Sequence, residues 1–276
     1  MPAISFGFLG LIVGSFLNVL VLRHGARSVG GRSACLSCGR EIAWYDLVPV
    51  FSWLWLRGRC RACRSRISAQ YPAVELLTGL LFLAVGLAPL PLFLRVLGLP
   101  IAALLIAIAV YDLRHTIIPD SWAYSFAALA LIYALAGLVE GSGSVLGAVV
   151  GGPAAASPLF FIWFISGGRW MGLGDSKLAL GIGWLLGPLY GTMAVLFAFI
   201  MGASVSLGLI AFSSASWKAF LKEFTPMHVS RKLALRFTMK SEVPFGPFLI
   251  ASCFIIWLLI SYGIDPLRFS SVLSLS

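Results

Sequence analysis

Charged residues are scarce in this chain of 276 residues: Asp, Glu, Lys and Arg together make up 11%, and only ten residues are acidic. An average soluble domain carries about 25% charged residues. Hydrophobic residues make up 60% of the chain, and the mean hydropathy is +0.98. The composition therefore excludes a soluble globular protein and predicts an integral membrane protein.

Internal repeats and low-complexity tracts are also lacking, and eight apolar segments fill most of the chain. A membrane-spanning helix needs about 20 predominantly apolar residues. Leu178–Leu186 is too short to cross alone, so we expect its helix to begin near Asp175 and to end at Gly187 and Pro188. The sequence predicts an all-α polytopic membrane protein with about eight transmembrane helices: Ile4–Leu22, Ala73–Leu87, Leu92–Tyr111, Trp122–Leu138, Val145–Ile165, Leu178–Leu186, Thr192–Phe212 and Phe248–Ile260.

The polar stretches divide the chain into three predicted regions. Residues 1–22 hold the first transmembrane helix, which lacks a basic leading stretch and a small-residue cleavage site, so we expect a retained helix rather than a signal peptide. Residues 23–70 form a polar loop, and residues 71–276 form the rest of the transmembrane bundle. Within that bundle, residues 213–242 form a basic loop that fits either an amphipathic surface helix or a solvated connection.

The basic residues predict the orientation in the membrane. With eight crossings, 18 of the 20 Lys and Arg residues share one side, and only Arg95 and Arg268 lie on the other. Positive charge is enriched in cytoplasmic loops, so we expect these 18 to be cytoplasmic and both termini to lie outside. The formal net charge of +10 then favours membrane lipid as a partner. No soluble module remains to bind nucleic acid, so no nucleic-acid partner is expected.

Four of the five cysteines form two Cys-x-x-Cys pairs in the loop 23–70, namely Cys35 with Cys38 and Cys60 with Cys63. Two such pairs can complete a tetrahedral shell of thiolates around zinc. Cytoplasmic thiols stay reduced, so zinc is favoured over disulfides or free thiols. A closed four-thiolate site has no open coordination position, so the metal would fold the loop rather than activate water. Cys253 is most simply a small buried hydrophobic residue.

Four of the ten acidic residues lie in or beside predicted spans: Glu75, Asp112, Asp120 and Asp175. Ionisable groups there are costly, which makes each a functional candidate. Asp112 ends the third span and Asp175 begins the sixth, both at the cytoplasmic side. If these helices are neighbours, the two carboxylates face each other across one water molecule. An aspartyl protease needs such a pair, with one carboxylate ionised and the other protonated.

Structural roles compete with this interpretation. Asp120 fits a helix N-cap, and Asp175 is also well placed to be one. Gly172 and Gly174 favour a function for Asp175, because glycines let another backbone approach closely. Asp112 closes a helix, where the helix dipole disfavours an anion, so a structural role is harder to supply. For Glu75, pairing with a loop arginine and a functional role are equally compatible with the sequence.

Six sequence elements, in this order, resemble the type IV prepilin peptidases, a family of intramembrane aspartyl proteases with a Gly-x-Gly-Asp motif. GLGD lies within MGLGDSKL, and the other elements are GSFLNVLVLR, the two Cys-x-x-Cys pairs, ISAQYPAVEL, YDLRHTIIPD and VPFGPFLI. Together they cover nearly the whole chain and are far more specific than GLGD alone. The chain departs from the family in having no proline in RHGARSVGGRSAC, before the first cysteine, and in its longer loop 213–242.

The resemblance implies an enzyme of the bacterial inner membrane that cleaves type IV prepilins or type II secretion pseudopilins after a glycine, at the cytoplasmic face. It also implies methylation of the new N-terminal residue with S-adenosylmethionine. The implied catalytic pair is Asp112 and Asp175, and the implied zinc ligands are the four paired cysteines. By the same resemblance, the supporting motif comprises Gly172, Gly174, Lys177 and Asp120, and the candidate methyl-transfer region comprises Asn18, Arg23, Tyr71 and Glu75.

Two alternatives are a peptidase without methyltransferase activity and a proton-coupled transporter in which Asp112 and Asp175 relay protons. The cysteine loop argues against the first, because we expect it to be absent from relatives that only cleave. Transporters show repeated halves and broken helices at the bilayer midplane. The two carboxylates instead cluster at one membrane edge, and no repeat is visible.

Overall fold

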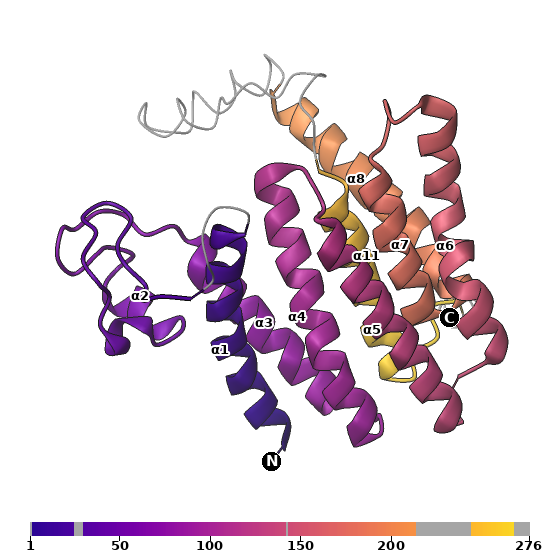
Figure 1. Ribbon diagram of the computed structural model, residues 1–276, viewed down its shortest axis with the longest axis horizontal. Helices are drawn as coiled ribbons and strands as arrows, with labels where there is room; N and C mark the ends of the chain where they lie inside the picture. Colours follow the sequence, from indigo (N-terminus) through magenta and orange to yellow (C-terminus); the bar gives the residue numbers. More distant parts are fainter. Residues whose placement is uncertain (1, 25–29, 142, 214–243, 268–276) are drawn as a thin grey trace, which may run out of the picture.

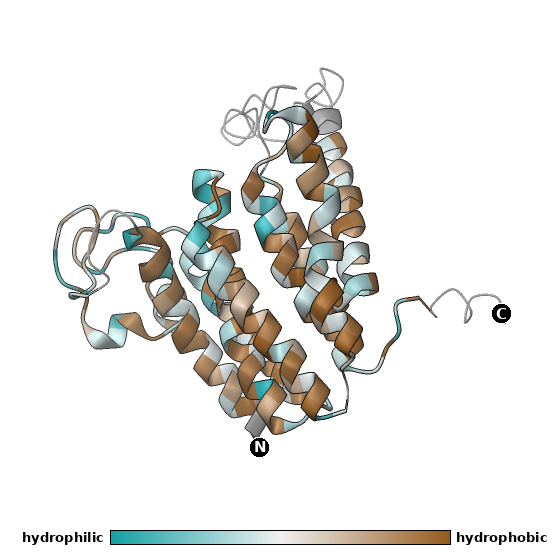
Figure 2. Ribbon diagram, turned by 45° about the vertical axis from the view of Figure 1, so that its right-hand side comes forward, coloured by the Kyte–Doolittle hydropathy of each residue, from teal (hydrophilic) through white to brown (hydrophobic). Residues whose placement is uncertain are grey.

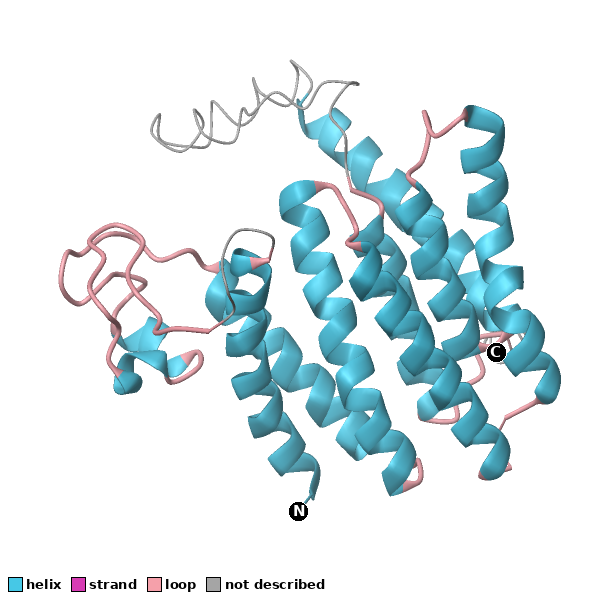
Figure 3. Cartoon of the chain, in the orientation of Figure 1, coloured by secondary structure: helices cyan, strands magenta, loops and turns pink. Residues whose placement is uncertain are grey.

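The computed structural model describes residues 2–24, 30–141, 143–213 and 244–267, and its regular structure is helical (Figures 1 and 3). Within these residues the only β-pairing is two isolated bridges in the cysteine loop. The prediction of an all-α membrane protein is therefore confirmed. The helices are α1 (Pro2–Arg23), η1 (Trp44–Leu47), α2 (Phe51–Trp55), α3 (Gln70–Leu87), α4 (Leu92–His115), α5 (Asp120–Val139), α6 (Val145–Ser166), α7 (Leu173–Leu186), α8 (Pro188–Ser213) and α11 (Gly246–Ser261).

All eight predicted apolar segments are helices. Six of them, α1, α3, α4, α5, α6 and α8, are long and apolar enough to cross a membrane. The other two are shorter, with 16 residues in α11 and 14 in α7. The short α7 has the predicted bounds: it begins two residues before Asp175 and ends at Gly187, whose φ of +83° leaves the helical region, and Pro188 begins α8.

The central helix of the bundle is α4. Its side chains Ile101, Leu105 and Ile108 are fully buried, and it packs against α1, α3, α5 and α11. In Figure 1, α1 and α3 lie on one side of α4, while α5, α6 and α7 lie on the other. Because neighbours surround α4 along its length, they fix the position of the residues in its last turn.

Polar residues gather at one end of the bundle. Figure 2 shows hydrophilic residues in the cysteine loop and at the adjacent ends of several helices, whereas most of the helical surface is hydrophobic. The connections after α1, α4 and α6 lie at this end, and the chain starts α1 and finishes α11 at the opposite end (Figure 1). The predicted basic loop 213–242 lies outside the described residues, apart from Ser213.

Glycines allow the closest helix contacts. A Cβ added to Gly183 of α7 would collide with the carbonyl oxygen of Gly151 in α6, and one added to Gly191 of α8 would lie 2.7 Å from the Gly183 Cα. A Cβ added to Gly10 of α1 would lie 2.6 Å from the carbonyl oxygen of Thr78 in α3. Membrane helices pack through small residues because lipid tails are as apolar as the side chains themselves. These glycines therefore fix how close α7 and α3 come to their neighbours.

We expect Gly183→Leu to lower the free energy of unfolding by about 3 kcal/mol or more, since overpacking a tight contact costs about 1–3 kcal/mol and backbone atoms cannot move aside. Thermal unfolding of the purified protein in detergent measures this. Gly208→Leu is the matched control, because an added Cβ on Gly208 of α8 meets nothing within 4 Å. Equal unfolding temperatures for the two variants would contradict the close contact.

Candidate active site and metal centre

Asp112 lies in the last turn of α4 and is buried, with 4% of its surface exposed. The helix ends at His115, and Thr116 follows it with a left-handed backbone and donates its N–H to the Asp112 carbonyl at 2.8 Å. The carboxylate Oδ2 has no hydrogen-bond partner of standard geometry among the described residues, although the backbone amide of Gly246 lies beside it. A buried carboxylate at a helix C-terminus is costly. Stability alone therefore does not explain Asp112.

Gly246, the first residue of α11, makes room for the Asp112 carboxylate. A Cβ added to Gly246 would lie 2.5 Å from Asp112 Oδ2, closer than atoms of two side chains come. Gly246 was not among the predicted site residues, although it lies in the predicted motif VPFGPFLI. The signal in the sequence that would have identified Gly246 is its position at the centre of PFGPF, at the start of an apolar helix.

Asp175 is the third residue of α7 rather than its N-cap, so the N-cap interpretation is wrong. Gly172 occupies the cap position without a side-chain cap. The Asp175 carboxylate still lies in the first turn, where the helix dipole favours an anion. A Cβ added to Gly172 would lie 3.9 Å from Asp175 Oδ2. The structure thus brings Gly172 next to the carboxylate, as the motif predicts.

The two carboxylates are close enough to interact electrostatically. Their helices do not pack along each other, as a direct pairing of the third and sixth spans would require; α4 and α7 instead each pack against α5 and α11. Ile118, in the α4–α5 connection, lies between them: a Cβ added to Gly174 would lie 3.1 Å from its Cβ, and one added to Gly246 would lie 3.4 Å from its Cδ1. Ile118 therefore packs against the glycine beside each aspartate, and Ile118 was not predicted.

Asp120 does not cap α5. It is the first residue of the helix, and the helix has no side-chain cap. Its carboxylate accepts a hydrogen bond from Lys177 Nζ at 2.7 Å, and this ammonium also lies 5.3 Å from the centre of the Tyr124 ring. Lys177 reaches Asp120 because α5 and α7 pack side by side. The ion pair joins the beginnings of both helices beside Asp175.

Four rings pack together next to Asp112. The Tyr111 ring lies 4.4 Å from that of His115, 5.3 Å from that of Trp122 and 5.3 Å from that of His24. His24 follows α1 directly and contacts Trp122 at 4.5 Å. Two of these four rings belong to histidines, His24 and His115. In the structure they hold the residue before Asp112 between the ends of α1 and α5.

The four paired cysteines form one cluster. Their sulfur atoms all lie within 4.8 Å of one another, with Cys35 and Cys63 3.8 Å apart. Each Cys-x-x-Cys pair forms the same turn, in which the residue after the second cysteine has a left-handed backbone: Gly39 has φ +71° and Arg64 has φ +58°. Isolated bridges, Ala34 with Glu41 and Arg59 with Arg66, flank the two turns.

The negative charges that the four cysteines carry as thiolates favour a cation at their centre. The N–H groups of Cys38 and Ser37 and the hydroxyl of Ser65 stabilise the Cys35 thiolate and lower its pKa to about 6. The N–H of Arg40 also acts to lower the pKa of Cys38, but Cys63 and Cys35 beside it raise that pKa to about 11. Four thiolates this close cannot all ionise without a positive charge among them. The cluster therefore fits a metal ion bound through four sulfurs.

The candidate methyl-transfer residues lie where α1 and α3 meet the cysteine loop. Asn18 is buried and donates to the carbonyl oxygens of Gly14 and Tyr71, while its Oδ1 has no partner among the described residues. Glu75 Oε2 accepts the N–H of Val50 at 2.7 Å. These contacts bring Asn18, Tyr71 and Glu75 to one helix interface.

Arg23, the last residue of α1, lies apart from that interface. Its guanidinium donates to the carbonyl oxygens of Gly30 and Arg32 in the loop. These hydrogen bonds are charge-assisted and hold the beginning of the described loop against the end of α1. The structure thus gives Arg23 a positioning contact with the loop.

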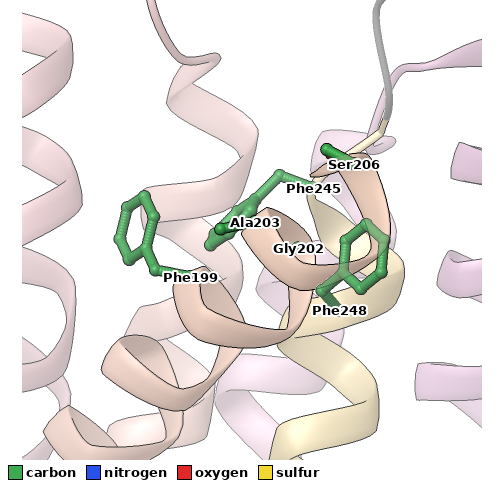
Figure 4. Close-up of a pocket in the computed structure, with 6 residues that line it drawn as sticks. All are labelled: Phe199, Gly202, Ala203, Ser206, Phe245 and Phe248. Carbon is green, nitrogen blue, oxygen red and sulfur yellow. The ribbon is translucent and has the colours of Figure 1, made fainter. Parts of the chain in front are cut away.

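An apolar recess of about 180 Å³ lies between α8 and α11, next to Gly246. Figure 4 shows the Phe199 and Phe245 rings on the same side of α8 and Phe248 on the other. Among the described residues that line the recess, Ser206 alone has a polar side chain; the others are Phe199, Gly202, Ala203, Phe245 and Phe248. The recess can accept an apolar side chain but supplies no acid, base or metal ligand.

Comparisons with known proteins agree with this geometry. The family described as Bacterial Peptidase A24 N-terminal domain matches residues 8–88, and the Type IV leader peptidase family matches residues 99–207. A Prepilin leader peptidase/N-methyltransferase of Pectobacterium carotovorum subsp. carotovorum is 34% identical over 248 residues, 80% of this chain and 85% of its own.

Two further curated proteins carry the same name. The protein of Myxococcus xanthus is 38% identical over 203 residues, 72% of this chain and 60% of its own. The protein of Burkholderia pseudomallei strain 1026b is 32% identical over 273 residues, 88% of this chain and 81% of its own. No solved structure shows significant similarity to the chain.

Proposed function

Because this chain belongs to the type IV leader peptidase family, we propose that it cleaves prepilin leaders with Asp112 and Asp175 as its catalytic pair. The observation that carries the proposal is the buried carboxylate of Asp112, whose Oδ2 has no hydrogen-bond partner of standard geometry among the described residues and which lies within electrostatic range of the Asp175 carboxylate. A carboxylate that only stabilised the fold would have a hydrogen-bond or ion-pair partner. A carboxylate that takes part in hydrolysis needs an oxygen free to bind water or substrate.

The chemistry follows from sharing one proton between two carboxylates. At this site one carboxylate is ionised and takes a proton from a water molecule, while the other is protonated and donates a hydrogen bond to the scissile carbonyl. The water oxygen attacks the carbonyl carbon, the tetrahedral intermediate collapses, and the C–N bond breaks as the amine takes up a proton. The two titrations belong to the pair rather than to either residue.

Glycines in the family motif give the substrate access to the carboxylates. Gly172 and Gly174 precede Asp175, and Gly246 faces Asp112, so these three positions add no side chain of their own beside the carboxylates. The substrate peptide must be extended at the scissile bond, and an extended backbone needs close approach. The neighbouring recess would receive an apolar side chain of the leader helix.

We assign the methyltransferase activity named in the relatives to the interface between α1, α3 and the cysteine loop. S-adenosylmethionine would supply the methyl group for the new N-terminal amine. The buried Oδ1 of Asn18 is an open acceptor that suits an amine or a donor group of this cofactor, and Glu75 and Tyr71 lie beside it. Arg23 would keep the loop in place over this interface. A peptidase without methylation remains the alternative, and the assay below separates the two.

We propose zinc as the metal of the four-cysteine cluster. A tetrahedral zinc ion with Zn–S bonds of about 2.3 Å holds its sulfurs about 3.8 Å apart, which matches the separation of Cys35 and Cys63. Four thiolates leave no coordination position for water or substrate. The ion would therefore stabilise residues 23–70 as a folded unit.

The proposed setting is the bacterial inner membrane. The ends that carry Asp112, Asp175 and the cysteine loop would face the cytoplasm, with both termini outside, because most basic residues lie at that end. Substrates would be type IV prepilins or type II secretion pseudopilins. The transporter alternative gains no support, since the carboxylates lie at one end of the bundle and not at its midplane.

Asp112→Asn and Asp175→Asn should each lower prepilin cleavage by about 10²–10⁴-fold, the range that a positioned acid or base contributes. Purified protein in lipid nanodiscs is incubated with a prepilin and labelled S-adenosylmethionine, and cleavage and label transfer are read separately. A pilin supplied already cleaved should still be methylated by both variants. Glu140→Gln, at the opposite end of α5, is the control. Full cleavage by either aspartate variant would refute the catalytic pair, and cleavage without any label transfer would leave only the peptidase.

Gly246→Ala should reduce cleavage by about 10²-fold without unfolding the protein, because a displacement of about 1 Å in an active site costs that much. The new Cβ would push against Asp112 Oδ2. Gly208→Ala, whose Cβ meets nothing within 4 Å, should cleave at the normal rate. Cleavage rates and thermal unfolding of the two variants are compared in parallel. Normal cleavage by Gly246→Ala would show that the Asp112 carboxylate does not need this space.

Elemental analysis should find about one zinc ion per chain, since four sulfurs complete one tetrahedral shell. Replacing Cys35 and Cys38 together by Ser should remove it. Cys253→Ala should keep the metal, because Cys253 is buried in α11 and lies outside the cluster. Metal-free protein in which the loop thiols cannot be alkylated would point to disulfides instead.

A further inference from the structure

Residues 44–55 of the cysteine loop, here called the aromatic segment, expose most of their large apolar side chains. Trp44 is 80% exposed and Trp55 is 84% exposed, and five more large apolar residues are exposed between them: Tyr45, Leu47, Val48, Phe51 and Leu54. Contiguous apolar surface of this kind marks contact with a membrane or a partner. Each of these side chains is at least 41% exposed.

The aromatic segment lies beside α1 and below its end. Val50 donates its N–H to Glu75 of α3, and a Cβ added to Gly14 of α1 would lie 2.7 Å from the Glu75 Cα. Gly14 precedes Arg23, the last residue of α1, by nine residues, which is about 13 Å along a helix that rises about 1.5 Å per residue. Figure 1 shows the same placement, with α2 alongside the middle of α1. The segment is therefore level with a membrane-spanning helix.

At this depth the neighbouring surface is lipid-facing. Ile12 and Phe16 of α1, on either side of Gly14 in sequence, are exposed and apolar. A hydrocarbon core is about 30 Å thick, so a point about 13 Å below the end of a spanning helix lies within one leaflet. Backbone groups at such depth need partners. Glu75 supplies one for the Val50 N–H, and the short helices η1 and α2 pair others internally.

The charges around the aromatic segment complement anionic lipid. Residues 30–69 carry seven arginines and two carboxylates, Glu41 and Asp46, and each carboxylate is paired with an arginine, Arg32 and Arg61 respectively. The surplus is positive, as in basic segments that bind anionic headgroups. A groove of about 220 Å³ between Tyr45, Val48, Phe51 and Trp55 borders the Asp46–Arg61 pair. The apolar walls of this groove match an acyl chain.

We propose that the aromatic segment is embedded in the lipid leaflet on the side of the bundle that carries the cysteine loop. Trp44, Phe51, Leu54 and Trp55 contact acyl chains within this leaflet, and the loop arginines contact phosphates. This contact anchors the four-cysteine cluster against α1 and α3. The inference does not depend on cleavage or methyl transfer.

Trp53 offers a matched control for Trp55 on the same short helix. Its indole N–H donates to the carbonyl oxygen of Ile67 at 3.3 Å, and its ring packs on Gly58. Trp53 thus faces the interior of the loop, whereas Trp55 faces outward. A photoreactive benzoylphenylalanine at position 55 replaces one exposed aromatic side chain by another and should leave the fold intact.

The test places this photoreactive residue at position 55 or 53 of the full chain, reconstituted in nanodiscs of phosphatidylethanolamine and phosphatidylglycerol, with a prepilin added. After irradiation, mass spectrometry identifies the adducts. We expect most adduct at position 55 to be phospholipid and most adduct at position 53 to join two parts of the same chain. Adducts at position 55 with a second copy of the chain, adducts with the prepilin, or no adduct at all would each overturn the proposal.

If the variant at position 55 fails to fold, nanodiscs with brominated acyl chains replace the photoreactive label. Bromine quenches tryptophan fluorescence on contact. The fluorescence removed by Trp55→Phe should then be strongly quenched in brominated nanodiscs, and that removed by Trp53→Phe should not. Equal quenching of the two contributions would also overturn the proposal.

Discussion

The cost of holding a carboxylate without a partner at the end of a buried helix governs the arrangement of this protein. Asp112 lies where α4 ends, in a low-dielectric setting and against the unfavourable end of the helix dipole. Its Oδ2 has no hydrogen-bond partner of standard geometry among the described residues, although the backbone amide of Gly246 lies beside it. The missing side chain of Gly246 leaves room for this oxygen, Ile118 lies against both Gly246 and Gly174, and Asp175 lies within electrostatic range. Gly246 and the packing of α11 against α4 thus accommodate this one group.

The sequence was sufficient to predict the features that depend on local chemistry. Apolar length located the eight helices, Gly187 and Pro188 ended α7, and the spacing of four cysteines placed their sulfurs in one cluster. The two aspartates were located correctly at the ends of their helices because a charged residue next to an apolar run marks the membrane edge. Each of these inferences needs only residues close together in the chain.

Features that depend on distant residues were missed or wrong. Asp120 has the sequence context of an N-cap. Its carboxylate instead accepts a hydrogen bond from Lys177, 57 residues later, across the contact between α5 and α7. Gly246 lies far along the chain from Asp112, so only the packing of α11 against α4 reveals why it lacks a side chain. The aromatic segment was assigned to a polar loop because its neighbours are basic. Its depth beside α1 follows from one hydrogen bond, between Val50 and Glu75, that no local pattern predicts.

The two shortest membrane helices, α7 and α11, both begin at the glycines beside the carboxylates. With 14 and 16 residues, they extend about 21 and 24 Å, whereas a hydrocarbon core is about 30 Å thick. A bilayer responds to such a mismatch by thinning around the short helices. Thinning of this kind would shorten the distance from the aqueous surface to Asp175. The short length of α7 would in this way supply the proposed hydrolysis with the water that it consumes.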